Sequence, residues 1–336
     1  MRDFHFSEIS KYLRCTVDHA YTYIERLESN KVRTAPSLGT IGHKVMQHLL
    51  RVHMWKEAFE SGPTCSLDDV VNEYVSSFNG FDDGQEFRDR YQETVSAAQA
   101  ACAWLLSNGW KPVLIEETLS TTIAVNDETV RIVGTVDLVL EGPHGDQWLV
   151  DNKFREKFRG AESEYFNLQM AMYQHLLNEN GFNVVGSRQL QIYPYAQKTP
   201  KVNKDGSLSK ADVMCDWDTY KAEVLKRDLN LDDYAQMEQK LSGKRFIDID
   251  SLMAYRSSAE IYNTWMLVVV PAILRIMRND PPIMVMDSSR CSRCDFKDLC
   301  VETLKGGDVD YFKRYMFHPA GTSPSDFRVT FSDEDE

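Results

Sequence analysis

We expect neither a membrane-spanning helix nor an N-terminal secretion signal in this sequence. Its longest apolar stretch, Trp265 to Leu274, is interrupted by Pro271 and is shorter than the roughly 20 residues of a spanning helix. The first residues, Met1 to Phe6, do not form an apolar core followed by a cleavage site of small residues. We therefore expect a protein of the cytoplasm, or of the host cytoplasm if the chain is viral, with no membrane partner.

Positive charge is also scarce. The chain has 38 lysines and arginines against 51 aspartates and glutamates, which gives a net charge of −13. This balance excludes a surface covered with positive charge, but a local basic groove can still bind nucleic acid. The last four residues, 333–336, are all acidic. We expect 321–336 to be an acidic flexible tail, and docking of this tail on a basic partner is the alternative.

The seven cysteines are an odd number in a chain without a secretion signal, which argues against a disulfide framework. Cys291, Cys294 and Cys300 follow one another as C-x2-C-x5-C, a spacing typical of metal ligands, and Cys15 is a candidate fourth ligand. A tetrahedral zinc site and an iron–sulfur cluster both use four thiolates, and the spacing does not choose between them. The remaining cysteines have no partner at such spacing and are interpreted as ordinary residues: Cys65, Cys102 and Cys215.

Hydrophobic periodicity predicts helices first and strands later. Helices are expected over 6–27, with Ser7 as its cap, and over 38–59, 67–78 and 85–107. Strands rich in β-branched residues are expected over 113–125, 130–140 and 147–154, as an antiparallel meander. A helix over 162–180 and a strand over 189–195 complete the core, and this crossover implies parallel pairing. A long apolar helix over 259–278 precedes the late cysteines.

Candidate catalytic residues lie on two neighbouring strands. Asp137 follows Gly134 within one strand, and Asp151 and Lys153 lie near the end of the next. Since side chains alternate along a strand, Asp151 and Lys153 share a face, and the meander brings Asp137 within reach. Two carboxylates and a backbone carbonyl are the hard oxygen ligands that Mg²⁺ or Mn²⁺ prefers, and the lysine can orient or deprotonate an attacking water. Asp-x-Lys alone is common at solvated strand ends. Only its combination with Gly-x-x-Asp on the neighbouring strand indicates a metal site.

Three further residues are candidates for this site. Gln169 and Tyr173 are four residues apart and share one helix face, from which they could orient the lysine or the DNA backbone. His43 could add a nitrogen ligand, which would favour Mn²⁺. The alternatives are a polar patch on a core-facing helix and a structural histidine.

A run of alternating cations starts at the candidate lysine. If the strand continues, Lys153, Arg155, Lys157 and Arg159 line one side of it, as a local phosphate-binding surface. The alternative is an exposed charged strand end or loop.

The order of these motifs resembles the RecB-like branch of the PD-(D/E)XK nucleases. The matching positions are Gly-x-x-x-His at His43, Gly-x-x-Asp at Asp137, Asp-x-Lys at Asp151 and Lys153, and Gln-x-x-x-Tyr at Gln169 and Tyr173. The resemblance implies an α/β (α+β) fold with a restriction-endonuclease-like core, whose mixed central sheet has about four to five strands flanked by helices. It also implies a Mg²⁺- or Mn²⁺-dependent deoxyribonuclease, acting as an exonuclease on single-stranded DNA or duplex ends. The acid of the third motif is aspartate here rather than glutamate.

The cysteines are similar to those of the iron–sulfur subset of this branch, which includes AddB and the CRISPR-associated exonucleases. That similarity implies a [4Fe–4S] cluster bound by Cys15, Cys291, Cys294 and Cys300, which would join the N-terminal and C-terminal helical segments. One departure is Thr16, which stands where a proline usually follows the first cysteine.

These interpretations predict one nuclease domain over 1–320, with a core at about 36–195, an accessory insertion at about 196–258, and a helix with the cysteine cluster at 259–305. DNA is the expected partner, together with proteins of DNA recombination, repair, replication or CRISPR adaptation. The alternatives are a non-catalytic DNA-binding subunit that retains the fold, and a zinc-stabilised interaction protein with an accidental Asp-x-Lys. The joint presence of Asp137, Asp151 and Lys153 favours the enzyme.

Overall fold

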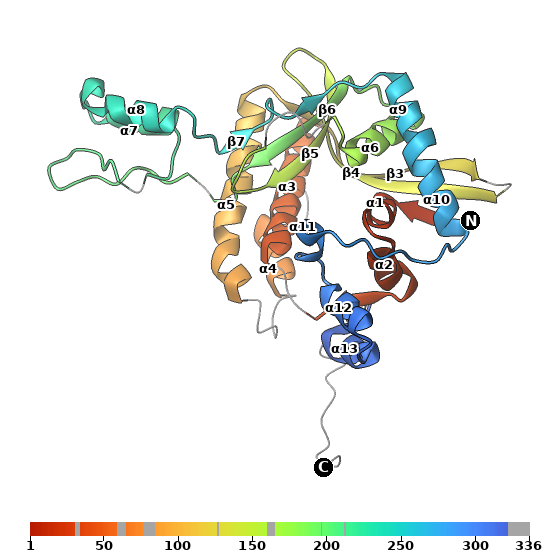
Figure 1. Cartoon of the computed structure of the whole chain (residues 1–336). Helices are drawn as coiled ribbons and strands as arrows, with labels where there is room; N and C mark the ends of the chain where they lie inside the picture. Colours follow the sequence, from red (N-terminus) through yellow and green to blue (C-terminus); the bar gives the residue numbers. More distant parts are fainter. Residues whose placement is uncertain are drawn as a thin grey trace, which may run out of the picture.

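The computed structural model describes residues 1–30, 34–58, 65–76, 85–125, 128–159, 165–195, 197–211 and 213–321. A mixed seven-stranded sheet lies at the centre, with helices on both faces (Figure 1). The strands run in the order β1-β4-β5-β6-β7, with β3 also paired to β4 and β8 also paired to β6. The predicted mixed α/β architecture is confirmed. The sheet exceeds the expected four to five strands because three very short strands extend it: β1 (Asp3–His5), β7 (Ile247–Asp248) and β8 (Met253–Ala254).

Four longer strands form the core of the sheet: β3 (Lys111–Val125), β4 (Glu128–Glu141), β5 (Gln147–Phe154) and β6 (Gly186–Ile192). The first three are an antiparallel meander, as predicted. Strands β5 and β6 pair in parallel from Trp148–Gly186 to Phe154–Ile192, across the connection that contains α6 (Leu168–Glu179). The predicted crossover is therefore confirmed.

Helices cover each face of this sheet and bury its two cores. One face packs against α3 (Thr34–Ala58), α4 (Leu67–Ser76) and α5 (Gln85–Ser107). The other packs against α1 (Phe6–Arg14), α6 and the continuous helical segment α9 (Ser258–Thr264), Trp265–Val269 and α10 (Val270–Met277). By length and composition alone, Ser258–Met277 is apolar enough to cross a membrane, a test that the core helix of a globular protein also passes. The absence of a membrane partner stays a prediction.

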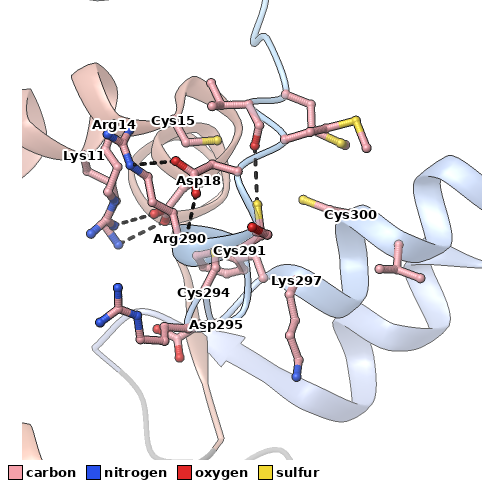
Figure 2. Close-up of a pocket in the computed structure, with 18 of the residues that line it drawn as sticks. Lys11, Arg14, Cys15, Asp18, Arg290, Cys291, Cys294, Asp295, Lys297 and Cys300 are labelled. Carbon is pink, nitrogen blue, oxygen red and sulfur yellow. Dashed lines mark hydrogen bonds and ion pairs between the residues drawn. The ribbon is translucent and has the colours of Figure 1, made fainter.

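The first helix differs from its prediction. It ends at Arg14, Cys15 adopts an extended conformation with φ −164° and ψ 117°, and α2 (Thr16–His19) then begins a new helical segment. Ser7 lies inside the first turn and does not cap it, and its hydroxyl accepts a hydrogen bond from Tyr23. The break at Cys15 takes this residue out of the helix and turns it toward the C-terminal segment (Figure 2).

The segment after β6 forms a small projection of its own (Figure 1). It contains α7 (Trp217–Lys226), a 3-10 turn (Leu231–Tyr234) and α8 (Ala235–Leu241). A separate core holds it together: Leu208, Val213, Cys215, Tyr220, Val224, Tyr234, Met237 and Leu241. The chain then returns to the sheet through β7 and β8, which both pair with β6.

The segment that follows α2 lies against the C-terminal elements. The C-terminal elements are α11 (Ser288–Cys291), α12 (Lys297–Lys305), α13 (Val309–Met316) and β9 (Phe317–Pro319). Strand β9 pairs with β2 (Leu27–Ser29), and Tyr21 packs with Phe296, Leu299 and Phe317 in a small core. Residues 322–336 of the predicted acidic tail lie outside the described part of the chain.

Candidate active site

The candidate acids meet where two strands of the sheet diverge. Strands β4 and β5 pair from Glu141–Gln147 to Leu138–Val150, and the next residues along are Asp137 and Asp151. Beyond this point the ladder between the two strands stops, and the backbone N–H of Asn152 donates to Asp137 Oδ2 at 3.2 Å. The divergence leaves space between the two strands for the carboxylates. Pairing of β4 with β3 and of β5 with β6 still holds the two backbones in place.

His43 lies over Asp137 from helix α3. Its Nδ1 is 3.4 Å from Asp137 Oδ2 and 3.7 Å from Glu116 Oε1, and its Nε2 is 2.9 Å from the carbonyl oxygen of Asn152. The ligand atoms of His43, Glu116 and Asp137 all lie within 4.8 Å of one another, which is close enough to hold one metal ion. The structure thus brings together His43 and Asp137, as the sequence predicted, and adds Glu116.

Glu116 was missed by the sequence analysis. It lies on β3 between Ile115 and Glu117, which pair with the neighbours of Asp137 on β4, so the two acids face each other across the strands. Its φ of 46° is in the left-handed region that a non-glycine residue rarely adopts. The available signal was an acid directly after the apolar run Val113 to Ile115, in the strand next to the candidate site.

The shared charges shift the proton affinities of these groups. Burial raises the pKa of Asp137 to about 7, and the neighbouring Asp151 carboxylate raises it as well. Burial lowers the pKa of His43, but the hydrogen bond to Glu116 and the charge of Asp137 outweigh it, so the net shift is upward. Both shifts favour protonation within the group of His43, Glu116 and Asp137, so protons and a cation compete for the same atoms.

Asp151 is almost fully enclosed, at 2% exposure. Its Oδ1 accepts a hydrogen bond from Lys153 Nζ at 2.7 Å, while its Oδ2 is buried without a hydrogen-bond partner among the described residues. A buried carboxylate oxygen without a partner is costly unless a cation or another donor compensates it. Asp151 lies outside the trio of Glu116, Asp137 and His43, but its unpaired oxygen fits the predicted role of a metal ligand.

Tyr173 and Gln169 reach this region from α6, as their spacing predicted. Tyr173 is buried against Gly134 of β4, where an added Cβ would lie only 2.7 Å from the tyrosine ring. Burial raises the pKa of Tyr173 to about 12, and a hydrogen bond with Gln169 opposes that shift. The phenol consequently stays neutral and can donate a proton in a hydrogen bond. Its charge coupling to Asp137 and Asp151 shows that it lies near them.

One comparison with known proteins bears on this arrangement. The sequence model of the PD-(D/E)XK nuclease superfamily matches residues 4–301. The chain belongs to the PD-(D/E)XK nuclease superfamily. No curated protein matches the sequence. A solved structure titled "Crystal structure of SSO0001" is similar at 11% identity over 56% of this chain and 71% of that chain, with a TM-score of 0.24, a likeness too loose to support an argument.

PD-(D/E)XK nucleases use divalent metals, and membership indicates a metal-dependent nuclease that acts on phosphodiesters. The residues present fit such an ion: the ligand atoms of two carboxylates and an imidazole lie within 4.8 Å of one another, and the buried Oδ2 of Asp151, on the neighbouring strand, has no hydrogen-bond partner among the described residues. Glu116 makes the donor set richer in acid than the sequence motifs alone predicted.

The four predicted cluster ligands of this nuclease line one cavity of about 580 Å³ (Figure 2). Cys15 comes from the break between α1 and α2, while Cys291, Cys294 and Cys300 come from the C-terminal segment. Burial raises the pKa of the Cys300 thiol to about 11, and the three other cysteines raise it further, Cys294 most. The prediction that these residues lie together is confirmed, although what they bind stays a prediction.

The expected row of four cations along the strand is wrong. Strand β5 ends at Phe154, and 155–159 is an irregular segment. Arg155 turns back onto β6, where it donates to Gln189 Oε1 at 3.0 Å and to Gln191 Oε1 at 3.4 Å. The alternation fails because these buried amides on β6 bond the chain directly after β5 and pull it out of the strand path. The interpretation of a charged loop is the one that holds.

Proposed function

We propose that the chain is a Mg²⁺- or Mn²⁺-dependent deoxyribonuclease of the RecB-like branch, acting as an exonuclease on single-stranded DNA or duplex ends. The observation that supports this most is the meeting of His43, Glu116 and Asp137 beside the Asp151–Lys153 pair. A degenerate, non-catalytic subunit would have no need to retain all of these groups in one place. We expect it to work in the cytoplasm, in DNA recombination, repair, replication or CRISPR adaptation.

The side chains would divide the work at the scissile phosphate. His43, Glu116, Asp137 and Asp151 would hold the cation, which when bound lowers the pKa of a coordinated water and neutralises phosphate charge. Lys153, whose ammonium is held by Asp151 Oδ1, would orient the attacking water or stabilise charge on the phosphate oxygens. Tyr173, a neutral phenol supported by Gln169, would donate a hydrogen bond to the substrate backbone.

We further propose that the four cysteines bind a [4Fe–4S] cluster with a structural role. Zinc–sulfur bonds of about 2.3 Å in a tetrahedron would place the sulfurs about 3.8 Å apart. Among the described residues, the cysteine sulfurs do not form a group of three within 4.8 Å of one another, and they surround a cavity of about 580 Å³ instead. This open arrangement favours a multi-iron group over a single zinc ion.

Digestion of end-labelled DNA by the full chain tests the enzymatic proposal. With Mg²⁺ or Mn²⁺, we expect short products released from the ends of single-stranded and duplex substrates, and no cleavage in EDTA. Asp151→Asn removes a proposed metal ligand, and Lys153→Met removes the ammonium group that is bonded to it. For each variant we expect the cleavage rate to fall by about 10²–10⁴-fold. The matched control is Asp146→Asn, an exposed acid in the loop before β5, which should retain the wild-type rate.

Undiminished cleavage by Lys153→Met would contradict the proposed active site. Binding of DNA without cleavage by the wild-type chain, with either metal, would instead identify a non-catalytic subunit. Internal cuts in a circular substrate would contradict the exonuclease assignment and leave the metal site in place.

A further inference from the structure

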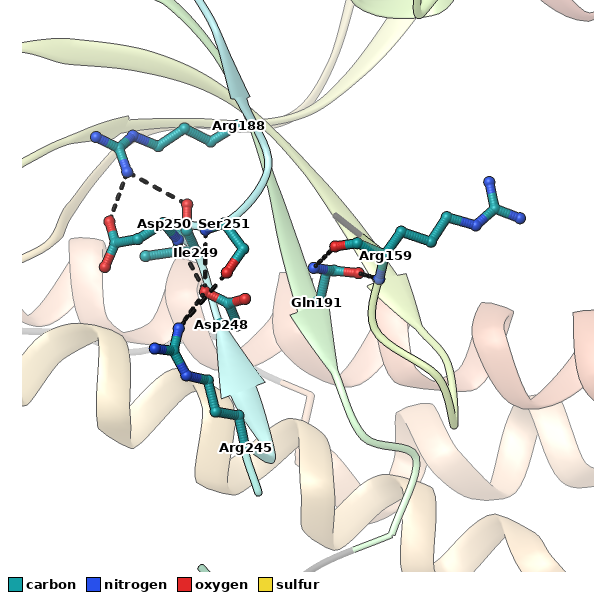
Figure 3. A network of polar contacts seen from close by, with 8 residues as sticks. All are labelled: Arg159, Arg188, Gln191, Arg245, Asp248, Ile249, Asp250 and Ser251. Carbon is teal, nitrogen blue, oxygen red and sulfur yellow. Dashed lines mark hydrogen bonds and ion pairs between the residues drawn. The ribbon is translucent and has the colours of Figure 1, made fainter. Parts of the chain in front are cut away.

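The segment that follows the catalytic strand is bonded to the sheet through a buried amide. Gln191 lies on β6 directly beside Lys153 in the parallel register and is fully buried. Its Oε1 accepts from the backbone N–H of Arg159 at 2.7 Å, and its Nε2 donates to the backbone carbonyl of Arg159 at 3.1 Å (Figure 3). One glutamine thus satisfies both main-chain polar groups of Arg159, as a neighbouring strand would.

Two other residues, Arg155 and Glu156, also hold this segment. The backbone N–H of Arg155 donates to the carbonyl of Ile192 at 2.9 Å, and the Arg155 guanidinium donates to Gln189 and Gln191. On its outer side, Glu156 accepts hydrogen bonds from Tyr195 at 3.0 Å and from Arg90 at 3.3 Å. The backbone of this segment is therefore held from both sides.

The side chain of Arg159 is exposed, whereas its backbone is hydrogen-bonded. Among the described residues, the Arg159 guanidinium makes no hydrogen bond or ion pair within this structure. Figure 3 shows the guanidinium pointing away from Gln191 while the backbone faces it. A cation whose main chain is fixed and whose charged end is free is preorganised for an anion from outside the chain.

Arg159 and Lys153 belong to the same face of the sheet. Lys153 and Gln191 are partners on adjacent parallel strands, so their side chains lie on one face. The backbone of Arg159 is bonded to the Gln191 side chain, so the segment that carries Arg159 lies over the face that carries Lys153.

We propose that Arg159 binds a backbone phosphate of the DNA strand that enters the proposed active site, and that Gln191 is a positioning residue that acts through Arg159. This inference rests on the proposed nuclease function, because it assigns the substrate contact of the same site. The ligand is the sugar–phosphate backbone of DNA, so the contact is independent of sequence.

The test measures DNA affinity and cleavage separately. Affinity of a fluorescent single-stranded oligonucleotide is titrated in EDTA over a range of salt concentrations, and cleavage is measured with Mg²⁺ over a range of DNA concentrations up to saturation. Arg159→Gln should weaken binding by about fivefold at low salt and reduce the slope of log affinity against log salt by about 0.7, as loss of one phosphate contact requires. KM should rise while kcat stays near wild type, and Arg159→Lys should restore the slope.

Gln191 is tested with a double-mutant cycle. Gln191→Leu should weaken DNA binding, and combination with Arg159→Gln should add little, because both changes remove the same contact. A glutamine with only a structural role would give additive effects on affinity. If Gln191→Leu fails to fold, the arginine variants still decide the phosphate assignment.

The matched control is Arg278→Gln, which alters an exposed cation after α10. If the wild-type chain binds and cleaves DNA but Arg159→Gln has the same affinity and salt slope as this control, the phosphate contact of Arg159 is contradicted. The proposed nuclease function is then unaffected. Salt-dependent binding that is lost in Arg159→Gln, in a chain that never cleaves, would support the inference and contradict the nuclease. A chain that neither binds nor cleaves DNA would contradict both.

Discussion

A single half-buried histidine lies among the candidate ligands of the site. His43 contacts the ligands that a divalent ion would bind, namely the carboxylates of Glu116 and Asp137 and the carbonyl of Asn152. The upward shifts of the His43 and Asp137 pKa values mean that protons compete with the cation for this place. Metal uptake should therefore release protons, and metal affinity should rise as the pH increases through about 7.

Glu116 illustrates what sequence motifs miss at this scale. Asp137, Asp151, Lys153, Gln169 and Tyr173 each belong to a short motif, and spacing along a strand or helix places them. Glu116 belongs to none, and its position depends on a left-handed backbone conformation that a sequence pattern does not encode. Its pairing opposite Asp137 follows only from the register of β3 on β4.

At the scale of elements, two glycines on helix α3 differ in how closely a neighbouring strand packs against them. An added Cβ at Gly42 would lie 2.4 Å from the Phe154 ring at the end of β5, whereas nothing lies within 4 Å at Gly39. Gly42 therefore lets the helix approach the strand closely enough for His43 to reach Asp137.

Substitution of these two glycines should have opposite effects on unfolding. Gly42→Ala should destabilise the protein by about 1–3 kcal/mol, because the phenyl ring must move, and should reduce cleavage through displacement of His43. Gly39→Ala should stabilise it by about 0.5–1 kcal/mol, since alanine favours the helix. Urea unfolding followed by circular dichroism measures both. Equal effects of the two substitutions would refute the close approach of α3 and β5.

The elements that could be predicted are the long ones with a clear period. Strand β5 and helix α5 begin and end where the sequence indicated, because each is bounded by turn residues and has a regular apolar pattern. The two-residue strands β7 and β8 are too short to have a pattern, and the break at Cys15 interrupts a helical period that continues on both sides of it. The course of 155–159 was missed because buried amides on a distant strand determine it.

For the whole molecule, packing joins the N-terminal segment around Tyr21 to the C-terminal segment, and the four cysteines lie beside this contact. Strand pairing of β2 with β9 and the small core around Phe296 already join these segments, and the cysteine cavity lies beside this core. The proposed cluster would thus strengthen an existing contact, because ligand binding is coupled to folding.

Cys300→Ser should lose the visible absorption of anaerobically purified protein and lower its melting temperature. The hydroxyl cannot replace a thiolate ligand, and the C-terminal segment would lose its proposed link to Cys15 through the cluster. Cys65→Ser is the matched control, since Cys65 is exposed and has no partner at ligand spacing. A colourless wild-type protein with one zinc per chain would contradict the iron–sulfur proposal, and unchanged stability of Cys300→Ser would contradict its structural role.

The central claim is that His43, Glu116, Asp137 and Asp151 share one divalent cation. Calorimetric titration of the wild-type chain and two glutamate variants with Mn²⁺, at pH 6 and pH 8, tests it most directly. We predict one site with higher affinity at pH 8, an affinity at least about tenfold lower in Glu116→Gln, and no change in Glu117→Gln, whose side chain is exposed on the same strand. Equal Mn²⁺ affinity in all three proteins, or none in the wild type, would contradict the account.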